Sequence, residues 1–246
     1  MRWLDLLFAH WPIDPEAVTS ILPPELELDT FGGQAWLGVV PFTMANVAPR
    51  GVPALPRFSR FPELNVRTYV RHRGRPGVWF LSLDAASWPT VRAARLVFHL
   101  PYVHAQMESV REGGFVRYRS VRDDPRRPPG QFRASYRPTG PAREATPGTF
   151  DEWATNRMRL FSAGHDGRIW RAEIDHPRWP LRPADGTVDA AEIVAVHGLR
   201  LPDEPPRLLF ADRLDVHGWL PIRTRRSPGD AAMPGAASTG GAGPAS

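Results

Sequence analysis

The chain has 246 residues, of which 42% are hydrophobic and 10% aromatic, and its formal net charge is +5. A chain of this length and composition buries a substantial core, which excludes disorder of the whole molecule. Cysteine and lysine are both absent. The sequence therefore excludes disulfides, thiolate metal sites, cysteine nucleophiles and lysine Schiff bases. The arginines are dispersed rather than arranged in a stripe, so we expect no nucleic-acid partner.

In the first 104 residues the patterns predict two helices and three strands. The first helix has Asp14 as its N-cap and Pro15 in its first turn, and it ends before Pro23. Strands follow over 35–42, 64–71 and 78–84, each bounded by Gly, Pro or Asp. Thr90 opens the second helix, which ends before Pro101.

The second half of the chain is predicted to contain mainly strands, over 115–121, 131–137, 168–174 and 208–220, with loops over 123–130 and 178–186. Thr149 with Glu152 forms a capping box for a third helix, whose apolar stripe continues to Phe161. Asp189 opens a fourth helix that ends at Gly198.

The predicted fold class is α+β, dominated by a large, mostly antiparallel sheet, because the helices do not alternate regularly with the strands. Residues 224–246 are too polar and Gly-rich to pack and are expected to form a disordered tail after a single domain over 1–223. No stretch is long and apolar enough for a membrane span, and the N-terminus does not resemble a signal peptide. We therefore expect a cytoplasmic protein without a membrane partner.

The segment 61–71 is the most informative candidate for a site. Strand alternation places Glu63, Asn65, Arg67 and Tyr69 on one face. One interpretation is an outer strand with a solvated face, which is ordinary in antiparallel sheets. The other is a polar row inside a barrel or cone, where Arg67 holds a carboxylate and Glu63 acts as an acid or base if burial raises its pKa.

A second candidate region runs from residue 79 to 104. Asp84 ends a buried strand, where a carboxylate is either a cap or a site residue. Arg95 lies among apolar residues, so it either extends to solvent or pairs with a buried acid. His104 is a further candidate for ligand binding. The eight histidines show no metal-ligand spacing, and the hydrolase elbow, Rossmann and Walker motifs are absent, so no metal or cofactor is predicted.

Several long motifs resemble those of a known bacterial family. They are His10-Trp11-Pro12-Ile13-Asp14-Pro15, Ala35-Trp36-Leu37-Gly38-Val39-Val40-Pro41-Phe42, Phe61-Pro62-Glu63-Leu64-Asn65-Val66-Arg67 and His176-Pro177-Arg178-Trp179-Pro180-Leu181. They look like the YqjF-like proteins, a domain-of-unknown-function family, and the resemblance covers residues 2–223. That family is grouped with the acetoacetate-decarboxylase-like fold. The resemblance implies a sheet curled into a barrel or cone around a central cavity, with a few short covering helices.

Acetoacetate decarboxylases carry a helix motif, G-R-E-x-x-G-F-P-K, that ends in the Schiff-base lysine. The similar stretch here spans 94–102, where Arg95 and Pro101 match and Tyr102 stands at the lysine position. Glu63 is similar to the carboxylate that supports the decarboxylase site. Because a phenol forms no imine, the resemblance implies the fold without Schiff-base decarboxylation.

Two classes of function remain open. In the first, the chain is an enzyme of lyase or isomerase type without covalent catalysis, with Glu63 as general base, Tyr102 as proton donor and Arg67 or Arg95 as carboxylate clamp. Asn65, Tyr69 and His104 would add contacts to a small carboxylate or carbonyl compound. In the alternative, the chain is a non-catalytic module for an apolar or aromatic ligand, and Glu63 and Arg67 form a structural ion pair. A homo-oligomer is compatible with either.

Overall fold

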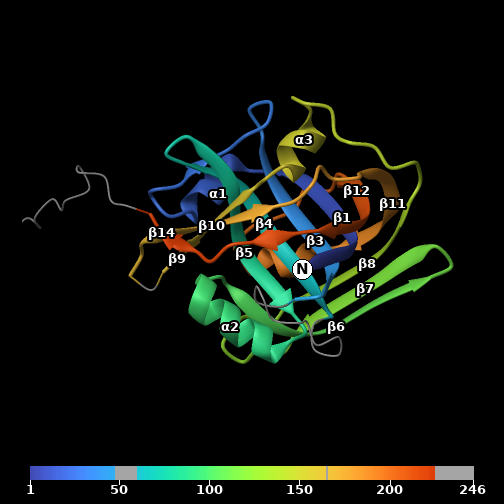
Figure 1. The fold of residues 1–246 in the computed structure, drawn as a ribbon, viewed down its shortest axis with the longest axis horizontal. Helices are drawn as coiled ribbons and strands as arrows, with labels where there is room; N and C mark the ends of the chain where they lie inside the picture. The colour runs from blue at the N-terminus through green and yellow to red at the C-terminus, as the bar shows by residue number, and fades with distance from the viewer. Residues whose placement is uncertain (48–59, 165, 225–246) are drawn as a thin grey trace, which may run out of the picture.

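The computed structural model describes residues 1–47, 60–164 and 166–224 (Figure 1). Its strands are β1 (Arg2–Ile13), β2 (Glu27–Leu28), β3 (Ala35–Ala45), β4 (Phe61–His72), β5 (Arg75–Ala85), β6 (Tyr102–Glu112), β7 (Phe115–Arg122), β8 (Gln131–Pro138), β9 (Arg159–Ala163), β10 (Ile169–Asp175), β11 (Arg182–Asp189), β12 (Arg207–Asp215), β13 (His217–Gly218) and β14 (Ile222–Arg223). Its helices are α1 (Pro15–Ser20), α2 (Trp88–Phe98), α3 (Phe150–Thr155) and α4 (Ala191–Ala195).

The described strands form one sheet that curls round on itself. Its order is β13-β10-β9-β5-β6-β7-β8-β11-β12-β1-β3-β4-β2, and an additional pairing of β4 with β5 closes the part from β5 to β4 into a ring. All pairs are antiparallel except those of β5 with β6 and with β9. The predicted fold class, a large and mostly antiparallel curled sheet with a few short helices, is confirmed.

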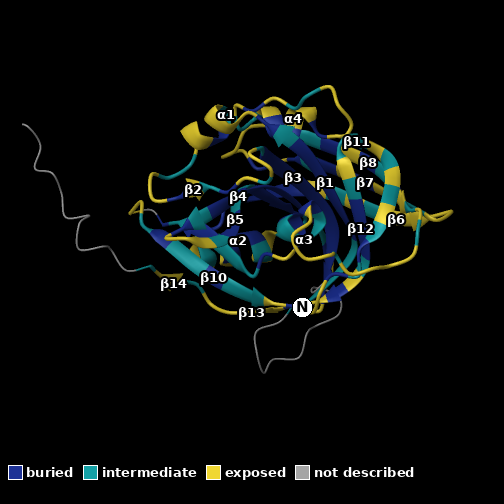
Figure 2. Ribbon diagram, turned by 90° about the horizontal axis from the view of Figure 1, so that it is seen from above, coloured by how far each residue is buried: buried dark blue, intermediate teal, exposed yellow. Residues whose placement is uncertain are grey.

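Two cores lie on opposite faces of the wall formed by β12, β1, β3, β4 and β5. The first, which we name the ring core, draws side chains from strands all round the ring: Leu7, Ala9, Leu37, Val39, Leu64, Val66, Val116, Phe132, Tyr136 and Phe210. The second core lies on the other face of the wall, under α2 and α3: Leu6, Phe8, Phe42, Tyr69, Phe80, Tyr102, Phe150 and Trp179. Figure 2 shows α3 lying within the curl of these strands.

Strand alternation explains why one wall supports two cores. Every residue of β3 is buried, since the strand lies in the middle of the wall and packs on both faces. Even-numbered residues of β4 such as Leu64 and Val66 face the ring core, and odd-numbered ones such as Tyr69 face the second core. A bulge in β5 opposite Val66 and Arg67 shifts the pairing by one residue.

The predicted helices are present, with corrections at their ends. Helix α1 has Asp14 as its N-cap, as expected. Helix α2 begins two residues before Thr90, because the hydroxyl of Ser87 accepts the hydrogen bond from the Thr90 amide. Helix α3 is capped by Thr149 but ends at Thr155, so the expected continuation to Phe161 is wrong. Helix α4 follows Ala190, which makes no side-chain capping bond, and Asp189 is the last residue of β11.

The strand predictions hold over 35–42, 64–71, 78–84, 115–121, 131–137 and most of 168–174, and 123–130 is a loop as expected. The loop predicted over 178–186 is wrong from Arg182 onward, where β11 begins. The strand predicted over 208–220 ends at Asp215 and is followed by the short β13. The predicted tail from Thr224 lies outside the described residues, except for Thr224 itself, which bonds to Ile169. No helix in the described ranges is long and apolar enough to cross a membrane.

Candidate functional site

The polar residues of β4 are buried against the second core. Glu63, Asn65, Arg67 and Tyr69 are 2%, 6%, 9% and 0% exposed. The interpretation of this strand as an outer strand with a solvated face is therefore wrong. These side chains do not point into the ring core either, because the neighbouring even-numbered residues occupy that side. The row instead faces the second core, where Arg67 and Tyr69 contact α3 and Glu63 contacts Tyr102 of β6.

Glu63 forms one end of this row. Its Oε2 accepts a hydrogen bond of 3.1 Å from the hydroxyl of Tyr102, so these two residues face the same space. Burial raises the pKa of Glu63 to about 8, and hydrogen bonds from Tyr102 and Asn65 offset part of that rise. A carboxyl with a pKa near neutral pH can both accept and donate a proton under physiological conditions.

Arg67 lies in the middle of the row, and its charge is poorly satisfied. Its Nη2 donates to the Tyr69 hydroxyl and to the carbonyl oxygen of Ala154 in α3, both at 3.4 Å. Its Nε is buried without a hydrogen-bond partner. Among the described residues, no carboxylate lies within ion-pair distance of Arg67, so the structural Glu63–Arg67 ion pair considered above is wrong. A buried cation without a counter-charge is costly and needs an explanation.

His10 of β1 completes the group, although the sequence did not single it out. Its Nε2 lies 2.6 Å from the Tyr69 hydroxyl. Arg67 also donates to that hydroxyl, so Tyr69 links the two side chains, and Nδ1 of His10 is buried without a hydrogen-bond partner. Burial, together with the charges on Arg67 and Arg207, holds the pKa of His10 well below its usual range, so His10 is neutral.

Gly38 makes the close approach of His10 and Arg67 possible. It pairs with Arg67 on β4 and with His10 on β1, so the three residues form one row across the sheet. A Cβ atom at Gly38 would lie 3.2 Å from His10 Nε2 and 3.4 Å from Arg67 Cγ. Glycine within a strand often marks such a close approach, and this was the available signal for His10.

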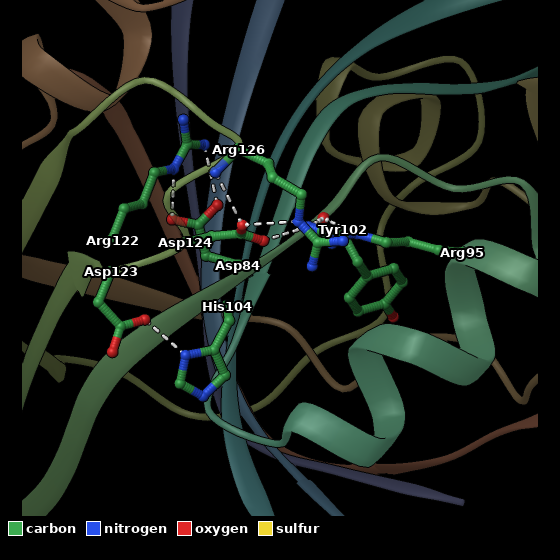
Figure 3. Close-up of polar contacts among 8 residues, drawn as sticks. All are labelled: Asp84, Arg95, Tyr102, His104, Arg122, Asp123, Asp124 and Arg126. Atoms are coloured by element: carbon green, nitrogen blue, oxygen red, sulfur yellow. Dashed lines mark hydrogen bonds and ion pairs between the residues drawn. The ribbon is translucent and has the colours of Figure 1, made fainter.

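Two other predicted site residues lie elsewhere (Figure 3). Arg95 of α2 donates from Nε to the main-chain oxygen of Tyr102 at 2.7 Å, and its Nη2 pairs with Asp124, whose side chain is fully buried. Of the two alternatives for Arg95, pairing with a buried acid is the one that the structure has. His104 pairs through Nδ1 with Asp123 and stacks on Trp88. The structure brings neither Arg95 nor His104 to the row on β4.

Asp84 is neither a cap nor part of this row. It faces the ring core, where its two oxygens accept hydrogen bonds of 2.9 Å from Nε and Nη2 of Arg122. Arg122 Nη2 also donates to the Ser82 hydroxyl at 2.6 Å. This is a satisfied, bidentate ion pair in the protein interior.

The hollows of the surface lie apart from the row. An open groove of about 650 Å³ runs over the outer face of β6, β7, β8 and β11 and is lined by Glu108, Arg119, Arg133 and Asp189 among others. A smaller hollow of about 30 Å³ lies beside α3 and Trp179. Neither is lined by Glu63 or Arg67. The resemblance implied a central cavity. At that place the structure has Phe150 and Ala154 of α3, which pack against the second core.

Solved structures with the same fold are acetoacetate-decarboxylase-like. An acetoacetate decarboxylase from Legionella pneumophila subsp. pneumophila strain Philadelphia 1 aligns with a TM-score of 0.60 and 14% identity, over 90% of this chain and 87% of that one. The enduracididine biosynthesis enzyme MppR, complexed with the condensation product of pyruvate and imidazole 4-carboxaldehyde, aligns with a TM-score of 0.61 and 14% identity, over 89% and 87% of the two chains. At these identities the likeness concerns the fold.

The sequence comparisons give the family. Uncharacterized protein YqjF of Bacillus subtilis (strain 168) is 39% identical over 221 residues, which cover 90% of each chain. Residues 1–215 match the DUF2071 family, described as an uncharacterized conserved protein. The chain therefore belongs to the DUF2071 family and has an acetoacetate-decarboxylase-like fold.

Proposed function

We propose that this chain binds a small 2-oxo acid at the row on β4 and catalyses proton transfer at the carbon next to its carbonyl group. The observation that carries the proposal is Arg67, a buried cation with no carboxylate partner among the described residues and an unpartnered Nε. A carboxylate bound to Arg67 would supply the missing counter-charge through two charge-assisted hydrogen bonds. Solved structures of MppR contain pyruvate or its condensation product, which supports a ligand of this class.

The spacing of Glu63 and Arg67 suits a molecule of a few carbon atoms. Four residues of a strand span roughly 13 Å between Cα atoms, and a ligand bound to both side chains would lie between them. A carboxylate on Arg67 would place the rest of the ligand toward Glu63. The ligand would replace the long contact of Arg67 with the Ala154 carbonyl oxygen, so α3 has to shift when the ligand enters.

The reaction requires no covalent intermediate. Glu63 as a carboxylate takes a proton from the carbon next to the carbonyl, the C–H electron pair forms the carbon–carbon double bond, and the carbonyl oxygen becomes the enolate oxygen. In the free chain the Tyr102 hydroxyl donates to Glu63 Oε2 at 3.1 Å, and once Glu63 is protonated it would donate its hydrogen bond to that oxygen instead. Return of the proton from Glu63 to carbon completes an exchange or isomerisation. Because the chain has no Lys, no imine is formed.

The test is exchange of the C3 protons of 2-oxobutyrate in D₂O, followed by proton NMR. We expect exchange with the wild-type chain and its loss in Glu63→Gln, which preserves the size of the side chain but is not a base. Glu112→Gln on β6 is the matched control, because Glu112 is exposed on the groove side of the sheet. Exchange by Glu63→Gln at the wild-type rate would remove Glu63 from the mechanism.

A binding module for an aromatic ligand is the second candidate. Phe31, Trp36 and Trp153 surround Phe150 of α3, with ring centroids 4.3 to 5.8 Å apart, so displacement of α3 would expose an aromatic surface. This candidate predicts that benzoate-sized aromatic compounds quench the tryptophan fluorescence while 2-oxobutyrate does not.

A further inference from the structure

A second buried guanidinium lies beside Tyr69. Arg157 follows α3 and is 7% exposed. Its Nη1 donates to Asp29 Oδ2 and its Nε to the Trp153 carbonyl oxygen, both at 2.6 Å. Its Nη2 is buried and has no hydrogen-bond partner. Nη1 and Nε therefore stabilise the local fold, and Nη2 has a donor that no described residue uses.

Tyr69 brings Arg157 and Arg67 into one site. The Cζ atom of Arg157 lies 5.0 Å from the centre of the Tyr69 ring and that of Arg67 lies 5.7 Å from it. Each guanidinium has one buried N–H group without a partner. Burial lowers the pKa of Arg157, and the charge on Arg67 is close enough to lower it further, so one small molecule beside the ring could contact both groups.

The charges around Tyr69 do not balance. Within the described residues, Asp29 is the carboxylate that pairs with the arginines around Tyr69. It is shared between Arg157 and Arg71. Arg67 adds a further positive charge, and His10 is neutral. With Arg71 included, whose side chain is 44% exposed, the group holds three arginines and this one carboxylate, which leaves two positive charges in excess.

We propose that the ligand carries two acidic groups, one bound by Arg67 and the other by Nη2 of Arg157. The chemical class is a small dicarboxylic acid, with its 2-oxo end at Arg67 and Glu63. This inference rests on the function proposed above and narrows its substrate class. Arg157 is a specificity-determining residue in this account, because it contacts the end of the ligand that does not react.

The test compares two five-carbon acids by calorimetric titration, 2-oxoglutarate with two carboxylates and 2-oxopentanoate with one. We expect 2-oxoglutarate to bind at least tenfold more tightly to the wild-type chain, since a hydrogen bond to a charged group is worth about that factor. In Arg157→Gln the two affinities should become equal while that for 2-oxopentanoate is kept.

Arg71→Gln is the matched control. Arg71 also pairs with Asp29, at 2.8 Å, but its side chain is 44% exposed and it lies at the end of the row. The variant removes one partner of Asp29 and leaves Nη2 of Arg157 in place, so the preference for the dicarboxylate should remain. If Arg157→Gln fails to fold, Arg157→Lys keeps a charge beside Asp29 but has no second terminal nitrogen at the position of Nη2, and the preference should still fall.

Three results would overturn the inference. Equal affinities of the wild-type chain for the two acids would exclude the second acidic group and leave the proposed function in place. Loss of the preference in Arg71→Gln as well would assign the effect to Asp29 rather than to Arg157. If neither acid binds at millimolar concentration, the proposed function fails together with this inference.

Discussion

A buried arginine lies against each face of the wall of strands, Arg122 of β7 on one and Arg67 of β4 on the other, and the hydrogen bonds of the two differ. Facing the ring core, Arg122 is held by both oxygens of Asp84 at 2.9 Å and by Ser82 at 2.6 Å. Facing the second core, Arg67 makes two long contacts of 3.4 Å and leaves Nε without a partner. Both side chains are buried, so exposure does not explain the difference.

The difference separates a structural charge from a functional one. A buried ion pair that is fully bonded stabilises the arrangement of strands around it, and neither partner is left for a ligand. A buried cation without a counter-charge is retained against its desolvation cost, which is the expected condition of a binding residue before its ligand arrives. This comparison supports the proposal that the ligand binds on the face of the wall that α3 covers.

The largest effect should come from breaking the satisfied pair. Asp84→Ala leaves Arg122 buried without its counter-charge, which costs about 3–5 kcal/mol of the free energy of unfolding. Chemical denaturation followed by tryptophan fluorescence measures this loss. A change below about 1 kcal/mol would mean that the Asp84–Arg122 pair does not hold the ring together.

Glu63→Gln should change how stability depends on pH. The pKa of Glu63 is about 8 in the folded chain, against 4.5 for the ordinary group. Between these values the folded state keeps a proton that the unfolded state has lost. The contribution of Glu63 to the free energy of unfolding is therefore complete below about pH 4.5. It falls by about 1 kcal/mol per pH unit up to about pH 8.

Denaturation of both proteins from pH 5 to pH 9 tests this sign. The wild-type chain should lose stability relative to Glu63→Gln as the pH rises, and the two curves should run parallel above pH 8. Parallel curves over the whole range would show that Glu63 is not buried in its neutral form.

Arg67→Met should have a much smaller effect on stability than Asp84→Ala. Methionine fills a similar volume, no carboxylate among the described residues loses its partner, and the unfavourable burial of a charge is removed. We expect the free energy of unfolding to change by less than about 1 kcal/mol or to increase. A loss comparable to that of Asp84→Ala would place Arg67 among the structural charges.

Gly38→Ala should change the free energy of unfolding least. Its effect on ligand binding at the row on β4 should be larger. The new Cβ would press on His10 and Arg67, while the lower entropy of the unfolded chain offsets part of that strain. We expect stability within about 1 kcal/mol of the wild type and a severalfold loss of affinity for 2-oxobutyrate in calorimetric titrations. Gly218→Ala, at a position remote from the row, is the control and should leave binding unchanged.

Much of the fold could be predicted from the sequence because its strands show clear alternation or apolar runs. The missed strands lack those patterns. Strand β1 is largely apolar on both faces, so it lacks the alternation of a half-buried strand. Strand β11 contains Pro183 and Gly186, which are typical of a loop. Gly186 has φ +155°, and a Cβ atom there would lie 2.2 Å from the Ser135 carbonyl oxygen, so glycine is required by packing against β8.

The site could be predicted where its members share one strand. Glu63, Asn65, Arg67 and Tyr69 come from the alternation of β4 alone, and Tyr102 came from the family resemblance. His10 and Arg157 belong to distant segments, so their positions depend on the register of β1 with β3 and on the path of the chain after α3. Arg95 and His104 lie outside β4, and the sequence does not show that their side chains turn toward Asp124 and Asp123.

Calorimetric titration of 2-oxobutyrate into the wild-type chain and into Arg67→Met at pH 7 tests the central claim most directly. If Arg67 is kept unpaired for a ligand carboxylate, the wild-type chain binds the acid and the variant binds it at least tenfold more weakly, with an unchanged free energy of unfolding. Equal affinities of the two proteins, or no binding by the wild-type chain at millimolar concentration, would contradict the claim.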